Sequence, residues 1–136
     1  MVHMVQNKNN IELEIILTLI RKEMHLREIA RILNESHSTV LRKINELVKE
    51  EALDYKKEGK NKVFYIRKNL KAKNYVYFAE IYKLTKLIKK YPELGVIFED
   101  VKKRVSRGMI LLFGSYAKGN PLKESDIDLY IETSNN

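Results

Sequence analysis

The feature that most constrains the fold lies near the C-terminus, where an unbroken apolar run meets a Gly-Ser pair. Residues 109–113 read Met-Ile-Leu-Leu-Phe and are followed directly by Gly114 and Ser115. An apolar run of this length predicts a buried strand, and Gly114 permits a sharp turn with close backbone approach. Ser115 stands where a short helix can begin, so free N–H groups and a hydroxyl would face an incoming phosphate.

A second pattern follows ten residues after Ser115. Acidic and polar residues alternate with apolar ones: Asp126, Asp128, Tyr130 and Glu132 with Ile127, Leu129 and Ile131. This alternation predicts a strand with one acidic face, on which Asp126 and Asp128 point the same way about 6.5–7 Å apart. Two such carboxylates can bind Mg²⁺ against a triphosphate. The alternative is a β-hairpin whose aspartates are merely solvated.

These residues carry a resemblance. Gly114-Ser115-x₁₀-Asp126-x-Asp128, with Tyr116-Ala117-Lys118-Gly119 after the serine, resembles the signature of the polymerase-β-type nucleotidyltransferase superfamily, and most closely its minimal nucleotidyltransferase branch. The resemblance implies that Gly114, Ser115 and Lys118 bind the nucleotide, with Lys118 where an arginine is more usual. It implies that Asp126 and Asp128 hold Mg²⁺ and act in catalysis.

The third carboxylate of that superfamily, carried on a later strand, is missing here. The only acid after Asp128 is Glu132, which would lie about 13 Å away along the same strand. We therefore expect a partial nucleotidyltransferase unit. Three explanations stay open: the chain is truncated, the enzyme has decayed, or a partner completes the site.

The first 70 residues show helical periodicity with helix-turn-helix spacing. Asn10 can cap a first helix with apolar residues at i, i+3, i+4 and i+7. A short helix is expected over about 27–33, then a tight turn at residues 34–36, with Ser36 capping a helix that runs to about Glu51. Two short helices joined by a three-residue turn, the second beginning with small polar and basic residues, are typical of a DNA-binding helix-turn-helix.

A hairpin is expected next, with strands at 53–57 and 62–67 around a lysine-rich tip. Residues 11–70 thus resemble the winged helix-turn-helix of prokaryotic transcription regulators. The resemblance implies a recognition helix at 37–51 in the major groove of double-stranded DNA and a wing against the backbone. The expected DNA-binding residues are His37, Ser38, Thr39, Arg42 and Lys43 on the helix and Lys56, Lys57, Lys60 and Lys62 on the wing. The alternative is a protein-interaction module.

Charge is distributed unevenly along the chain, whose net charge is +8. Residues 1–70 carry 14 Lys and Arg against 10 Asp and Glu, residues 71–107 carry 10 against 4, and residues 108–136 carry 2 against 4. A polyanionic partner therefore suits the first two blocks. The absence of cysteine excludes disulfides. With neither a long apolar run nor a signal peptide, we expect a cytoplasmic protein without a membrane partner.

A helix is expected over about 71–90, and Pro92 can open another. The first helix carries an apolar stripe at nearly heptad spacing, made of Tyr77, Phe78, Ile81, Leu84 and Ile88. Such a stripe is either core or a dimer seam, and it favours a homodimer. The expected fold is α/β (α+β) in three parts: a winged helix-turn-helix at 1–70, a connecting helix at 71–91 and a partial nucleotidyltransferase-like unit at 92–136.

The functional hypothesis favoured by these patterns is a DNA-binding regulator whose C-terminal part binds Mg²⁺ and a nucleoside triphosphate. Two alternatives stay open. One is an active nucleotidyltransferase that transfers a nucleoside monophosphate to a nucleic-acid or protein acceptor, with its site completed elsewhere. The other is an antitoxin-like partner of a small helical toxin, because minimal nucleotidyltransferases are often paired with one.

Overall fold

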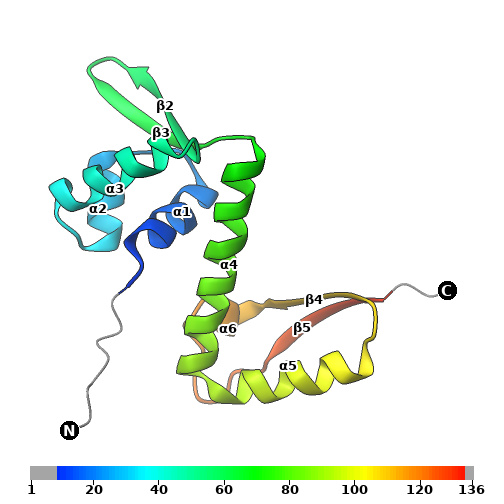
Figure 1. Ribbon diagram of the computed structural model, residues 1–136. Helices are drawn as coiled ribbons and strands as arrows, with labels where there is room; N and C mark the ends of the chain where they lie inside the picture. The colour runs from blue at the N-terminus through cyan, green and yellow to red at the C-terminus, as the bar shows by residue number, and fades with distance from the viewer. Residues whose placement is uncertain (1–8, 134–136) are drawn as a thin grey trace, which may run out of the picture. The chain divides into compact units, whose positions relative to one another are not determined.

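The chain forms two compact units, residues 1–82 and residues 83–136, and the division lies inside a long helix. The computed structural model describes residues 9–133 (Figure 1). The fold mixes helices with small antiparallel sheets, as the sequence predicts. Within residues 9–133, no helix is both long and apolar enough to cross a membrane.

Three helices form the centre of the first unit. They are α1 (Ile11–Arg21), α2 (Leu26–Leu33) and α3 (His37–Lys49). The side chain of Asn10 caps α1 by accepting a hydrogen bond from the Leu13 N–H at 3.2 Å. Asn34 ends α2 in the left-handed conformation at φ 52°, which asparagine tolerates well. The turn into α3 therefore lies where the sequence predicts it.

A small antiparallel sheet provides the wing. It contains β1 (Met24–His25), β2 (Leu53–Glu58) and β3 (Asn61–Ile66) in the order β1-β3-β2. The register runs from Leu53 opposite Ile66 to Glu58 opposite Asn61, and Gly59 takes a positive φ of 61° at the tip. Three helices followed by a two-stranded hairpin make a winged helix, which confirms the expected fold of residues 11–70.

The core of the first unit draws on every element of the winged helix. Its fully buried side chains include Ile15, Ile16, Ile29, Val40, Ile44, Leu47 and Leu53. The first part of α4 (Leu70–Lys90) packs Ala72 and Ala79 inward at 0% exposure. The Tyr82 hydroxyl accepts a hydrogen bond from the Asn10 N–H at 3.1 Å and donates one to Glu14 Oε1 at 3.0 Å. The connecting helix predicted at 71–91 is therefore in part a fourth helix of the winged unit.

The second unit contains the end of α4 and four further elements: α5 (Pro92–Arg104), β4 (Gly108–Phe113), α6 (Gly114–Ala117) and β5 (Asp128–Thr133). Pro92 occupies the first helical position of α5, as predicted. Strands β4 and β5 pair antiparallel, with Phe113 opposite Asp128. The Tyr91 ring packs edge-on against Tyr116 at 5.3 Å between centroids, which connects the start of α5 to α6.

The expectation of a buried strand at 109–113 is wrong. Met109, Leu111 and Phe113 are 44%, 46% and 51% exposed, whereas Ile110 and Leu112 between them are half-buried. Among the described residues this sheet has only two strands and is covered on one face only. The side chains of β4 on the covered face are Ile110 and Leu112. An apolar run alone does not reveal how many layers will cover a strand.

Candidate functional site

The start of α3 is organised by a hydroxyl network. Ser36 Oγ accepts a hydrogen bond from the Thr39 N–H at 3.2 Å and donates one to Thr39 Oγ1 at 2.8 Å. Ser38 Oγ lies 3.2 Å from Ser36 Oγ. This N-cap satisfies a free N–H of the first turn. Thr39 is half-buried within the cap, whereas His37 and Ser38 are exposed and accessible to a partner.

A polar stripe runs along the exposed side of α3. A shallow surface hollow is lined by Ser38, Leu41, Arg42, Asn45, Glu46 and Lys49. These residues recur at helical spacing on the side opposite the buried Val40, Ile44 and Leu47. The side chain of Asn45 has no hydrogen-bond partner among residues 9–133. Asn45 and Lys49 were not among the predicted DNA contacts, although they follow Arg42 by three and seven residues on the same polar face of the helix.

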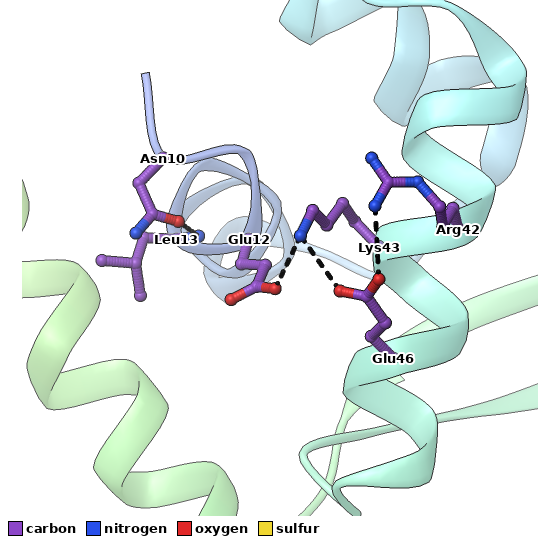
Figure 2. A network of polar contacts seen from close by, with 6 residues as sticks. All are labelled: Asn10, Glu12, Leu13, Arg42, Lys43 and Glu46. Atoms are coloured by element: carbon purple, nitrogen blue, oxygen red, sulfur yellow. Dashed lines mark hydrogen bonds and ion pairs between the residues drawn. The ribbon is translucent and has the colours of Figure 1, made fainter. Parts of the chain in front are cut away.

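Lys43 and Arg42 are neighbours in sequence, but their environments differ (Figure 2). Lys43 Nζ lies 3.0 Å from Glu12 Oε1 on α1 and 3.0 Å from Glu46 Oε2 on α3, and its side chain is 24% exposed. Arg42 Nη1 approaches Glu46 Oε1 at 3.4 Å, and its side chain is 63% exposed. Lys43 therefore joins α3 to α1, whereas Arg42 is open to a partner.

The ion pairs of this network shift its acid–base equilibria. Hydrogen bonds to Glu46 and then Glu12 raise the pKa of Lys43. The hydrogen bond from Lys43 is the main cause that lowers the pKa of Glu46. Both shifts favour the charged forms, so Lys43 and Glu46 stay ionised near neutral pH.

The wing lysines also differ in their partners. Lys56 pairs with Glu23 and, at 4.0 Å, with Glu58. The Lys62 ammonium lies 4.1 Å above the centre of the Tyr55 ring, a cation–π contact. Lys57 and Lys60 are exposed and form no ion pair with any residue from 9 to 133. These two are therefore the wing cations most accessible to phosphate.

A hollow between the wing and the helices adds a cation that the sequence analysis missed. It is lined by residues of α2, α3, β3 and the hairpin turn, which include Arg27, Leu41, Lys60, Lys62 and Phe64. Arg27 lies in the first turn of α2, far in sequence from the wing. Only the tertiary fold reveals that Arg27 shares this hollow with Lys60 and Lys62.

In the second unit, the turn after β4 places Gly114 against Asp128. Gly114 has φ +74°, and a Cβ built on it would lie 2.2 Å from Asp128 Oδ2. Because Phe113 pairs with Asp128 across the hairpin, the carboxylate reaches the backbone at the start of α6. The structure thus brings together the glycine and one carboxylate of the Gly-Ser…Asp-x-Asp motif.

The other residues of the motif lie outside strands β4 and β5. Strand β5 begins at Asp128, so the exposed Asp126 precedes the strand, and the predicted strand spacing of the two aspartates does not apply. Ser115 is half-buried in α6, and its carbonyl accepts a hydrogen bond from the Asn120 N–H at 3.1 Å. Lys118 is exposed at the end of α6.

The residues present fit a single Mg²⁺ better than a pair. The described part of the chain contains no cluster of three or more His, Cys, Asp or Glu side chains suited to a metal. Mg²⁺ is commonly bound by one or two carboxylates, with phosphate oxygens and water completing its six positions. Two carboxylates such as Asp126 and Asp128 would suffice for one such ion, whereas a two-metal site requires more ligands than they would supply.

Comparison with known proteins supports both halves of the sequence interpretation. Residues 94–136 match the family model described as a nucleotidyltransferase domain. That segment contains α6, both strands of the second sheet and all of Gly114, Ser115, Asp126 and Asp128. No curated protein matches the chain.

Solved structures share the fold at low sequence identity. The transcriptional repressor BigR from Xylella fastidiosa is 13% identical with a TM-score of 0.50, over 57% of this chain and 77% of that one. A point mutant of ZitR from Lactococcus lactis is 18% identical with a TM-score of 0.51, over 70% and 65%. The PcaV transcriptional regulator from Streptomyces coelicolor, in complex with its natural ligand, is 11% identical with a TM-score of 0.50, over 72% and 74%. The winged-helix fold is therefore shared with transcription regulators.

Proposed function

We propose that this protein is a DNA-binding transcription regulator whose winged helix binds double-stranded DNA. The observation that carries the proposal is the exposed stripe of α3, where Ser38, Arg42, Asn45 and Lys49 follow one face of the helix. A helix presenting such a stripe can enter the major groove. Arginine contacts guanine edges or phosphates there, and asparagine can contact adenine through two hydrogen bonds.

The wing supplies the second part of this interface. Lys57 and Lys60 are exposed at or near the hairpin tip, and Arg27 and Lys62 line the hollow beside it. Side chains of this kind contact phosphates without reading sequence. In this proposal α3 recognises the DNA bases, whereas the wing and Arg27 contact phosphates and supply the salt-dependent part of the affinity.

DNA binding is tested by fluorescence anisotropy, with labelled duplexes selected from a random 30-base-pair pool, between 50 and 300 mM salt. Arg42→Ala is expected to weaken binding and to make the salt dependence shallower by about 0.9 in log–log slope if one phosphate contact is lost. Asn45→Ala is expected to relax sequence preference by about 1–3 kcal/mol at one base pair. Arg104→Ala is the matched control, because Arg104 is an exposed arginine that pairs with an acid four residues away on its own helix, as Arg42 does, but lies on α5 and not on α3. An equal loss from Arg104→Ala and Arg42→Ala would refute the assignment.

Binding of a nucleoside triphosphate with Mg²⁺ by the second unit is the second part of the proposal. It is supported by the nucleotidyltransferase match over 94–136 and by the contact between Gly114 and the Asp128 carboxylate. Gly114, Ser115 and Lys118 would hold the phosphates, and Asp126 and Asp128 the metal. In the alternative of full catalysis, an acceptor hydroxyl attacks the α-phosphate and pyrophosphate leaves.

Calorimetric titration with ATP, CTP, GTP and UTP, with and without Mg²⁺, tests this second part. We expect metal-dependent binding that Asp126→Asn and Asp128→Asn abolish. Glu132→Gln is the matched control, because Glu132 is an acid on the same strand as Asp128. Binding that survives both aspartate substitutions would overturn the site. Pyrophosphate release in the same samples would distinguish transfer from binding alone.

A further inference from the structure

Helix α4 carries a heptad pattern more specific than an apolar stripe. Positions 70, 74, 77, 81, 84 and 88 alternate in steps of four and three, the spacing of the a and d positions of a coiled coil. The residues at these positions are Leu70, Asn74, Tyr77, Ile81, Leu84 and Ile88. The helix is 21 residues long, which is three heptads. Its length and pattern therefore suit pairing with another helix.

Most of the heptad seam, defined here as positions 70, 74, 77, 81, 84 and 88 of α4, is exposed, while the opposite side of the helix packs on the winged helix. Leu70, Tyr77, Ile81 and Leu84 are 73%, 53%, 61% and 42% exposed. Ala72 and Ala79, which occupy f positions in the same register, are fully buried. The winged helix therefore packs against the f positions of α4 and leaves positions 70, 74, 77, 81 and 84 exposed, whereas Ile88 is half-buried beside Gly95 of α5.

The residue types on the seam specify a particular partner. Ile81 and Ile88 fall at a positions, and Leu70 and Leu84 at d positions. Branched Ile at a with Leu at d favours a parallel two-stranded coiled coil. Asn74 is the polar residue of the seam, at an a position, where a single Asn selects register and two-strand association. We propose that α4 pairs in parallel with α4 of a second copy of this chain, and that Asn74 pairs with its counterpart to set the orientation.

The antiparallel arrangement is disfavoured by the same residues. With full overlap of the two helices, it would place Asn74 opposite Leu84, leaving a buried amide without a partner. It would also bring the two Glu80 side chains, at g positions, to facing places and create like-charge repulsion. In the parallel arrangement g positions face e positions, so Glu80 faces Thr85 and Lys73 faces Phe78. Both the pairing of Asn74 with its counterpart and the separation of the two Glu80 charges therefore favour the parallel arrangement.

Single-cysteine crosslinking tests orientation directly, because the chain has no cysteine of its own. In the full-length Leu84→Cys variant, a parallel pair places the two sulfurs in one layer, so mild oxidation is expected to yield a covalent dimer. In an antiparallel pair, the cysteine would face Asn74 and no dimer would form. Lys83→Cys is the matched control, because it lies one residue off the seam at an exposed position. Equal crosslinking of both variants, or none of Leu84→Cys, would overturn the proposal.

Association is measured separately by sedimentation velocity. Tyr77→Glu puts a charge on the seam at a side chain that is 53% exposed in the single chain, so the fold should persist by circular dichroism. We expect its dimer dissociation constant to rise about 100-fold or more. Asn74→Leu is expected to associate still, but no longer only as a dimer, so trimers or tetramers should appear in the sedimentation profile. A monomeric wild type, or an unchanged Tyr77→Glu dimer, would refute the seam. These readouts need neither DNA nor nucleotide, so they stand apart from the proposed function.

Discussion

Replacing Gly114 with alanine tests whether this glycine is required by its backbone angle alone or also by Asp128. Gly114 and Gly119 share almost the same φ, +74° and +75°. A Cβ on Gly114 would lie 2.2 Å from Asp128 Oδ2, whereas a Cβ on Gly119 would meet nothing within 4 Å. Gly119→Ala is therefore a control that shares the backbone strain and lacks the contact.

The magnitudes separate the two effects. Alanine in the left-handed region costs about 1–2 kcal/mol, and both variants should lose this much. In Gly114→Ala the methyl group also displaces the Asp128 carboxylate, and forcing a side chain from its rotamer costs about 0.5–1.5 kcal/mol. In an Asp128→Ala background the obstructing oxygens are gone, so the extra cost of Gly114→Ala should vanish.

Hydrogen exchange of the β4–β5 amides, followed by mass spectrometry, measures this local stability. The extra cost corresponds to exchange about 2- to 12-fold faster in Gly114→Ala than in Gly119→Ala. The reasoning is refuted if the two alanine variants exchange alike, or if their difference persists without Asp128. Either result would mean that the glycine and the carboxylate do not meet.

Two further predictions concern the first unit. Lys43→Ala should lower the thermal midpoint of unfolding measured by calorimetry, because it removes the cation between Glu12 and Glu46. Arg42→Ala should leave this midpoint unchanged. A larger drop for Arg42→Ala than for Lys43→Ala would contradict the roles assigned to these residues. Hydrogen bonds from Lys22, Lys43 and Lys71 lower the pKa of Glu28, Glu46 and Glu51 from the ordinary 4.5. Such carboxylates stabilise the fold above their unfolded pKa and lose that contribution as pH falls through the folded pKa, so the free energy of unfolding should be flat from pH 7 to about 5 and decline below about 4.5. Urea titrations at each pH check this, and Glu46→Gln should make the decline shallower.

The winged helix was predictable because its signals are local. Asn10 and Ser36 cap the helices that they were expected to cap, and Pro92 begins α5. Helix caps, prolines and apolar periodicity depend on residues within one or two helical turns of each other, so each can be recognised in a short stretch of sequence. The three-part division of the chain stays a prediction, while the structure assigns the first part of α4 to the winged unit.

Other features depended on contacts between distant segments. The sequence placed Arg42 and Lys43 together as DNA contacts, but Glu12, thirty-one positions before Lys43, gives that lysine a role within the fold. The sequence likewise did not predict that Arg27 and Lys60 line one hollow, or that Met109 on β4 is exposed. A charge pattern shows which residues are cations, and it does not show which of them already have a carboxylate partner.

The helix and strand types, the winged-helix order and the Gly-Ser…Asp-x-Asp motif can all be read from the residues alone, because they follow from spacing and local backbone preference. Three-dimensional packing sets which cations stay exposed, which strand side chains are covered, and that Gly114 lies against the Asp128 carboxylate. The physical reason is that burial and ion pairing are properties of three-dimensional neighbours. Residues far apart in the chain become neighbours only when the helices and the hairpins pack.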